Sequence, residues 1–371
     1  MKKPGLFLAK LFISFAFGFL LLEIALRIID PFDFTVKGDR IVLPANKTYA
    51  FENKVNPRLD PSILVKKNSL GFRGPEPTAD FAQRFTVIAV GGSTTFCDML
   101  TEGKTWTDLL AVRLQKDFPT IWMNNAGLTG HSTIGHLTLL KEHVLRIKPK
   151  VILFLVGVND IGTDHAWIYD DNILKWRFDF YSARAFAQSL ARNIEVLNVS
   201  VNLYRAHLAK TRNLVYFDLD LKKQPQIDVP DAVRERVIAE NKKEGVPAYR
   251  SRIEELESLC RQNNITAIFI TQPALYGPVV DDVTGVDLGK MEFGKDRDGA
   301  LMWDRLELYN DQLRQLAKEG RIDVIDLARL MPKSYRYYSD SIHFTNAGAE
   351  KIAELLAGPL AALLKKKAVP A

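Results

Sequence analysis

Short apolar runs alternate with longer segments of helical periodicity along most of this chain. From residue 85 onward, five runs rich in Val, Ile and Phe contain few polar positions, as expected of strands buried on both faces of a parallel sheet. They cover residues 85–90, 121–124, 151–156, 265–271 and 322–327. Amphipathic helices are predicted between and after them, over residues 106–118, 134–147, 249–262, 303–318 and 347–364.

This alternation predicts an α/β fold. Strands that are joined through helices run parallel, with right-handed crossovers that place helices on both faces. We therefore expect a three-layer, doubly wound domain over residues 85–371, with one parallel five-stranded sheet. Residues 163–246 contain no clear strand and predict a helical insertion after the third strand. This insertion is either a lid or wall of the substrate site, or a peripheral helical subdomain that rests on the membrane or forms a dimer.

The first thirty residues are strongly apolar after Lys2 and Lys3, with Glu23 and Arg27 as interruptions near the far end. About 20 apolar residues suffice to span a bilayer as a helix. We interpret residues 1–30 as an uncleaved signal anchor; a cleaved secretory signal and a buried or interfacial helix are the alternatives. The lysines would keep the amino terminus in the cytoplasm, which places the body outside the inner or cell membrane. Residues 31–84, rich in proline, are predicted to be an irregular stalk.

Composition adds little to this picture. The chain of 371 residues is 47% hydrophobic and carries a net charge of +6, part of it in the lysine tract at residues 365–367. No nucleic-acid-binding motif accompanies this charge, so a nucleic-acid partner is not predicted. The two cysteines, Cys97 and Cys260, do not form a disulfide framework and are expected to be free, buried thiols.

The first strand ends in a glycine turn followed by Ser93. A strand, a glycine turn and a helix place a serine hydroxyl at the carboxyl edge of an α/β sheet. Polar residues follow other predicted strands as well: Asn159 after the third, and Asp340 and His343 after the fifth. Because all these positions meet at one edge, they predict a nucleophilic site: Ser93 attacks an ester carbonyl, His343 is the general base, and Asp340 orients its ring.

The oxyanion of such a reaction needs hydrogen-bond donors already in place. We expect the backbone N–H groups of Ser93 and Gly127 and the side-chain amide of Asn159 to supply them. Asp160 is expected to be structural and to bind loop amides.

Four short blocks, in order along the chain, resemble those of the SGNH (GDSL-type) hydrolases: residues 91–94, Gly127, residues 157–160 and residues 340–343. The resemblance implies a flavodoxin-like sheet of order 2-1-3-4-5, the residue roles given above, and a serine ester hydrolase without metal or cofactor. Gly92 stands where the name-giving pattern has Asp. The α/β-hydrolase pattern G-x-S-x-G does not fit, because Thr95 replaces its last glycine.

Other polar and aromatic residues near these blocks are candidates for substrate contact: His131, His165 and Trp167. His136 and His143 share one face of a predicted helix, but no further ligand cluster accompanies them. Since metal sites need several such ligands together, no metal site is predicted.

The sequence as a whole predicts a membrane-anchored, exported serine esterase with an ester substrate. O-acetyl groups on envelope or extracellular polysaccharide are the first substrate hypothesis. A lipase or lysophospholipase acting at the membrane is one alternative. An acyltransferase, or a non-catalytic scaffold for polysaccharide assembly, is another.

Overall fold

The computed structural model describes residues 4–29, 31–38, 40–54, 56–161, 190–211 and 219–368. The chain divides into two compact units. One consists of Met1–Pro44 and Ile173–Leu214, and the other of Ala45–Asn172 and Val215–Ala371. The predicted insertion is therefore shared between the two units.

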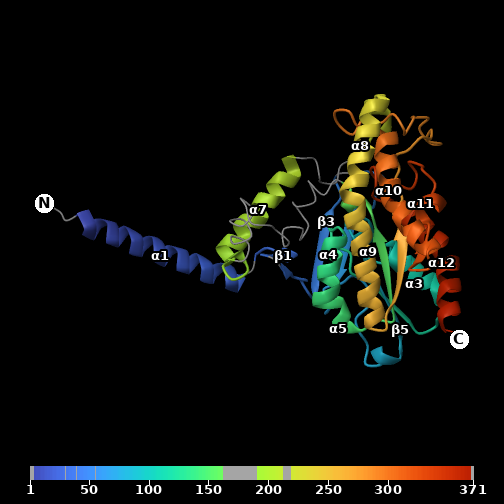
Figure 1. The fold of residues 1–371 in the computed structure, drawn as a ribbon. Coiled ribbons are helices and arrows are strands. Elements are labelled where there is room, and N and C mark those ends of the chain that lie inside the picture. Colours follow the sequence, from blue (N-terminus) through green and yellow to red (C-terminus); the bar gives the residue numbers. More distant parts are fainter. Residues whose placement is uncertain are drawn as a thin grey trace. The chain divides into compact units, whose positions relative to one another are not determined.

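The second unit is built on a parallel five-stranded sheet (Figure 1). Its strands are β5 (Phe85–Gly91), β6 (Ile121–Asn125), β7 (Val151–Val156), β8 (Thr266–Thr271) and β9 (Asp323–Ile325). They lie in the order β6-β5-β7-β8-β9, and every neighbouring pair is parallel. This is the 2-1-3-4-5 order, so the predicted fold is confirmed.

Helices cover both faces of this sheet. Alternate residues of the strands, such as Val87, Leu153 and Ile268, share one apolar cluster with α3 (Trp106–Leu114) and α12 (Asn346–Ala368). The residues between them point to the opposite face, because side chains alternate along a strand. There, α4 (Thr133–Leu139), α9 (Gly245–Gln262) and α10 (Gly299–Lys318) contact the sheet. The covered faces explain why the strand sequences are almost uniformly apolar.

The proline-rich segment before the sheet is more regular than predicted. It contains an antiparallel hairpin of β3 (Lys47–Glu52) and β4 (Ser62–Lys67). β3 is exposed along nearly its whole length, so its sequence shows no alternation of apolar and polar residues. In the insertion, α8 (Asp231–Lys243) packs on α9 and α10.

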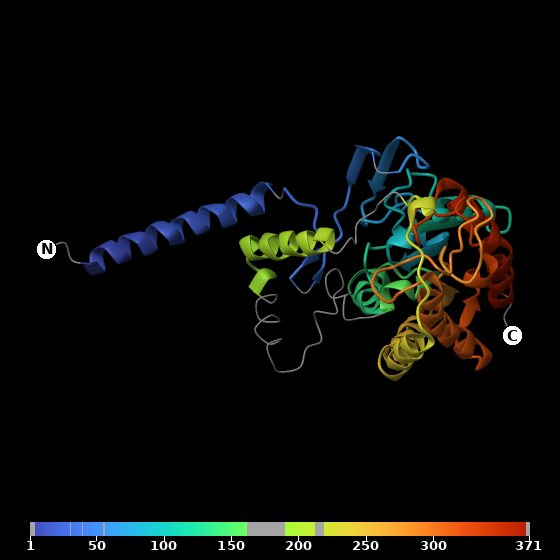
Figure 2. The same ribbon diagram turned by 90° about the horizontal axis from the view of Figure 1, so that it is seen from above.

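The first unit combines the amino-terminal helix with part of the insertion. α1 (Pro4–Ile29) contains an apolar stretch, Phe7–Ile29, that is long and apolar enough to cross a membrane, with a mean hydropathy of 2.2. The strands β1 (Val36–Lys37) and β2 (Arg40–Ile41) follow as a short hairpin. α7 (Glu195–Thr211) contacts α1 near its carboxyl end, as both views show (Figures 1 and 2).

Candidate active site

Ser93 lies at the carboxyl end of the central strand β5, as the first residue of the short helix α2 (Ser93–Phe96). The turn that precedes it requires glycine. A Cβ at Gly91 would lie 2.1 Å from Oγ1 of Thr95 and 2.8 Å from the carbonyl oxygen of Leu155. Close packing between β5, β7 and α2 therefore fixes the backbone of the turn and the position of the serine hydroxyl.

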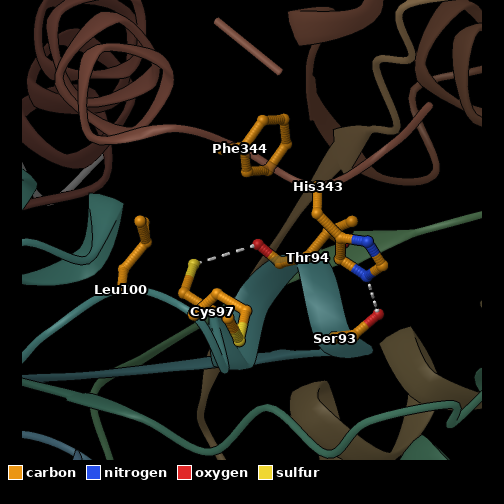
Figure 3. Close-up of a pocket in the computed structure, with 7 residues that line it drawn as sticks. Ser93, Thr94, Cys97, Leu100, His343 and Phe344 are labelled. Atoms are coloured by element: carbon orange, nitrogen blue, oxygen red, sulfur yellow. Dashed lines mark hydrogen bonds between the residues drawn. The ribbon is translucent and has the colours of Figure 1, made fainter. Parts of the chain in front are cut away.

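The structure brings Ser93, His343 and Asp340 together in one hydrogen-bonded chain. Nε2 of His343 is 2.7 Å from Oγ of Ser93, as Figure 3 shows, and Nδ1 is 2.6 Å from Oδ2 of Asp340. The other oxygen of Asp340 accepts hydrogen bonds from the backbone N–H groups of Ile342 and His343, at 2.9 and 2.8 Å. Because a carboxylate only accepts, Nδ1 carries the proton and Nε2 is left to accept from the serine.

The two buried titratable groups stabilise each other's charged forms. Burial alone would raise the pKa of Asp340, but the charge of His343 and the hydrogen bonds from His343 and Ile342 outweigh it, and the pKa lies below its ordinary value. Burial alone would lower the pKa of His343, but the Asp340 carboxylate raises it above its ordinary value of 6.5. Asp340 therefore stays ionised and favours the imidazolium that forms when His343 takes a proton.

Asn159 follows β7 in a turn that begins at Gly157, whose φ is +133°. Its side-chain Nδ2 donates to the carbonyl oxygen of His131 at 2.9 Å. The same nitrogen would lie only 2.3 Å from a Cβ at Gly92, so the amide packs directly against the turn that carries Ser93. A side chain at position 92 would therefore meet the Asn159 amide, and glycine leaves the space that this amide occupies.

The backbone N–H of Ser93 is also suited to oxyanion binding. Ser93 is the first residue of α2, and the first amides of a helix have no acceptor within the helix. Its N–H and the second Nδ2–H of Asn159 stay candidate donors for the oxyanion.

The backbone N–H of Gly127, the third predicted oxyanion donor, already has a hydrogen-bond acceptor. It donates to Oδ1 of Asn125 at 2.9 Å. A Cβ at Gly127 would lie 2.4 Å from the backbone nitrogen of Phe96. Glycine is therefore required here by close packing against α2, and the amide expected to bind the oxyanion is engaged by a neighbouring side chain.

Among the remaining predicted residues, His131 and Asp160 are not part of the hydrogen-bonded chain around Ser93. The side chain of His131 is 1% exposed, and its carbonyl positions Asn159, so substrate contact would require the ring to be uncovered. His165 and Trp167 lie outside the described residues. Asp160 is structural, as expected: it accepts from the Thr133 hydroxyl at 2.5 Å and pairs with Arg252 at 3.0 Å.

A small cavity opens beside the nucleophile (Figure 3). Apart from Ser93 and His343, its walls are mainly apolar: Thr94, Cys97, Met99, Leu100 and Phe344. Its empty volume is about 190 Å³ with the open mouth included. Only about 10 Å³ of it can hold the centre of a water-sized atom, roughly the room that one water molecule needs. Burial raises the pKa of the Cys97 thiol to about 12, so this wall stays uncharged.

Two arginines that were not predicted as site residues bind the loops next to Ser93 and Asp340. The buried side chain of Arg73 donates to the carbonyl oxygens of Phe96, Cys97 and Leu100, at 2.9, 2.8 and 2.8 Å. Arg58 donates to three carbonyl oxygens in the loop before Asp340, at 2.7 to 2.8 Å: those of Tyr335, Tyr338 and Ser339. The only sequence signal was an arginine among the turn residues at 68–74.

No protein-family model and no curated protein matches the chain. Solved structures do match it. Axe2, an acetylxylan esterase from Geobacillus stearothermophilus, is 14% identical with a TM-score of 0.40, over 73% of this chain and 91% of the esterase. A protein of the lipolytic G-D-S-L family from Desulfitobacterium hafniense is 14% identical with a TM-score of 0.40, over 74% and 98%. A GDSL-like lipase from Parabacteroides merdae is 11% identical with a TM-score of 0.39, over 73% and 92%.

Proposed function

We propose that this chain is a membrane-anchored serine esterase that hydrolyses short-chain esters, with O-acetyl groups of envelope or extracellular polysaccharide as its substrates. The observation that carries the proposal is the continuous hydrogen-bonded chain from Ser93 through His343 to Asp340. A serine hydroxyl bonded to an imidazole, itself oriented by a buried carboxylate, is the arrangement of an activated nucleophile.

The proposed reaction has two halves. Oγ of Ser93 attacks the ester carbonyl carbon while Nε2 of His343 takes the hydroxyl proton. The resulting oxyanion is bound by the N–H groups of Ser93 and Asn159. The tetrahedral intermediate expels the alcohol, which receives the proton from His343, and an acyl-serine remains. Water, deprotonated by His343, then attacks the acyl-serine and releases the carboxylic acid, which regenerates Ser93.

The small cavity supports a short acyl group. Its apolar walls suit a methyl group, and its size leaves no room for a long acyl chain. Half-buried apolar side chains near Asn159 and His343 in the chain pack against Ala274, Tyr276 and Leu306: Val158, Ile161 and Ile342. The cavity thus favours an acetylesterase over a lipase.

The apolar stretch Phe7–Ile29 supports the anchor. It is 23 residues long, which corresponds to about 34 Å of helix and exceeds the roughly 30 Å of a bilayer core. Lys2 and Lys3 precede it, and their positive charge supports an orientation with the esterase on the periplasmic or extracellular side.

The experiment compares the detergent-solubilised full chain with Ser93→Ala on p-nitrophenyl esters from acetate through decanoate, and on an acetylated polysaccharide with release of acetate as the readout. We expect kcat/KM to be highest on acetate and to fall with chain length, and Ser93→Ala to lower it by at least about 10³-fold. Rates that rise with chain length would favour the lipase. Loss of acetyl groups to a sugar acceptor without free acetate would favour a transferase. Equal rates for both proteins would contradict the proposal.

A further inference from the structure

Glu23, which interrupts the apolar stretch of α1, binds the backbone at the start of α7 through its carboxylate. The Glu23 carboxylate accepts hydrogen bonds from the backbone N–H groups of Glu195 and Val196, at 2.9 and 3.0 Å. Arg27, one turn further along α1, donates to the same carboxylate at 2.8 Å and also to the carbonyl oxygen of Asn193. Glu23 is only 9% exposed. The first amides of a helix lack partners within it and attract negative charge, so Glu23 acts as a cap supplied by another helix.

This contact fixes the depth at which α7 begins. Glu23 precedes the end of the apolar stretch at Ile29 by six residues, which corresponds to about 9 Å along the helix. Interfacial helices lie about 5–10 Å deep, at the boundary of headgroups and acyl chains. Figure 1 shows α7 running across the direction of α1 rather than alongside it. A helix that starts at this depth and turns away from a membrane-spanning helix runs along the bilayer surface.

A helix that packs in water buries its apolar side, whereas the buried side of α7 carries polar residues. Among its described side chains, the buried ones are polar: Asn198 and Asn202, the latter donating to the carbonyl oxygen of Val36 at 3.0 Å. Leu203 is 49% exposed and Tyr204 is 58% exposed. The other exposed residues described on α7 are Ser200, Ala206 and His207. Further apolar side chains on α7 are only partly buried: Val196, Leu197, Val199 and Val201. The exposed Leu203 and Tyr204, with the half-buried valines and leucine beside them, give a helix at the membrane boundary apolar side chains that match lipid.

We propose that α7 is an interfacial helix whose apolar side chains insert into the outer surface of the bilayer, with Glu23 as the link that holds it there. This inference rests on the proposed membrane anchor. The partner is the lipid bilayer itself, at the boundary where an apolar helix face and a tyrosine hydroxyl are both accommodated. The insertion thereby gains a second attachment to the membrane beside α1.

Spin labels on single introduced cysteines test the inference in the full chain, reconstituted into phosphatidylethanolamine–phosphatidylglycerol nanodiscs. Cys97 and Cys260 are buried, and burial raises the pKa of both thiols to about 12, so they do not compete for the label. The labelled variants are Leu203→Cys on α7, Phe15→Cys on α1 and Val112→Cys on α3, with side chains 49%, 75% and 65% exposed. Accessibility to oxygen, which enters lipid, is compared with accessibility to a water-soluble nickel chelate.

We expect the labels at Leu203 and Phe15 to be accessible to oxygen and protected from nickel, and the label at Val112 to show the opposite. A water-accessible label at Leu203 with a lipid-accessible label at Phe15 would overturn the inference and leave the anchor intact. A water-accessible label at Phe15 would overturn both. Glu23→Ala should shift only the Leu203 label toward water. Circular dichroism spectra and thermal unfolding curves that match those of the unsubstituted chain show that each variant is folded.

Discussion

At the scale of single residues, Asp340 determines the form in which His343 acts. Burial by itself would favour the neutral imidazole, and the carboxylate overcomes this effect and raises the pKa of His343 above 6.5. A general base must be unprotonated before it can act. The acid limb of kcat/KM, which reports the free enzyme, is therefore expected above pH 6.5, with activity lost as the pH falls through it.

Asp340→Asn should move this limb in a defined direction. Without the carboxylate, burial is left to dominate, and the pKa of His343 falls below its ordinary value, so the acid limb moves to lower pH. The rate on the plateau should fall by about 10⁴-fold, because an amide no longer selects the tautomer with the proton on Nδ1. The measurement is the pH profile of kcat/KM for p-nitrophenyl acetate. An acid limb at the same pH in the variant would show that Asp340 does not control the pKa of His343.

At the scale of elements, the segment before the sheet holds both catalytic loops. Arg73 binds the loop after Ser93 through three carbonyl oxygens, and its backbone exchanges hydrogen bonds with Asn125 at the end of β6, at 3.0 and 2.8 Å. Arg58 binds the loop before Asp340 in the same manner. One segment thus fixes the spacing between the nucleophile and the acid.

Arg73→Lys should lower kcat more than it raises KM. A single ammonium group cannot reproduce the planar fork that reaches three carbonyl oxygens, so at least one buried acceptor loses its partner. We expect a loss of about 2–3 kcal/mol in the free energy of unfolding. Displacement of Ser93 by a fraction of an ångström should lower kcat by about 10- to 100-fold.

The matched control is Arg84→Lys in the same segment, whose partner Asp80 is exposed; we expect no measurable change there. Thermal unfolding and steady-state kinetics of both variants provide the comparison. A destabilised Arg73→Lys protein with unchanged kcat would show that the arginine supports the fold and not the position of Ser93.

The same elements show what the sequence could and could not reveal. The strands of the sheet were predictable because both faces are covered, which leaves uniformly apolar runs such as Val151–Val156. The triad was predictable because Ser93 follows one strand, Asp340 and His343 follow another, and parallel strands end at one edge. The exposed strand β3 left no such pattern. The side-chain hydrogen bonds of Arg73 reach residues 23 to 29 positions away, and the bond between Gly127 and Asn125 depends on a side-chain conformation that no spacing encodes.

At the scale of the whole molecule, one compact unit contains the proposed membrane anchor and the other contains the candidate active site. The triad, the cavity, the two arginines and the entire sheet belong to the unit formed by Ala45–Asn172 and Val215–Ala371. The other unit contains the apolar helix and its link to α7. The catalytic residues and the proposed membrane contacts therefore share no hydrogen bond among those described above.

A chain that begins at Ala45 should show this separation. It lacks α1 and Glu23, so the first turn of α7 loses its acceptor and should become sensitive to limited proteolysis within residues 195–211. Its kcat/KM on p-nitrophenyl acetate should stay within about 2-fold of the full chain, because the removed contacts are remote from the triad. Sedimentation with vesicles should be lost. The full chain carrying Glu23→Ala is the matched control: it should show the same cleavage and still sediment. A folded but inactive truncated chain would show instead that the anchor unit contributes to the active site.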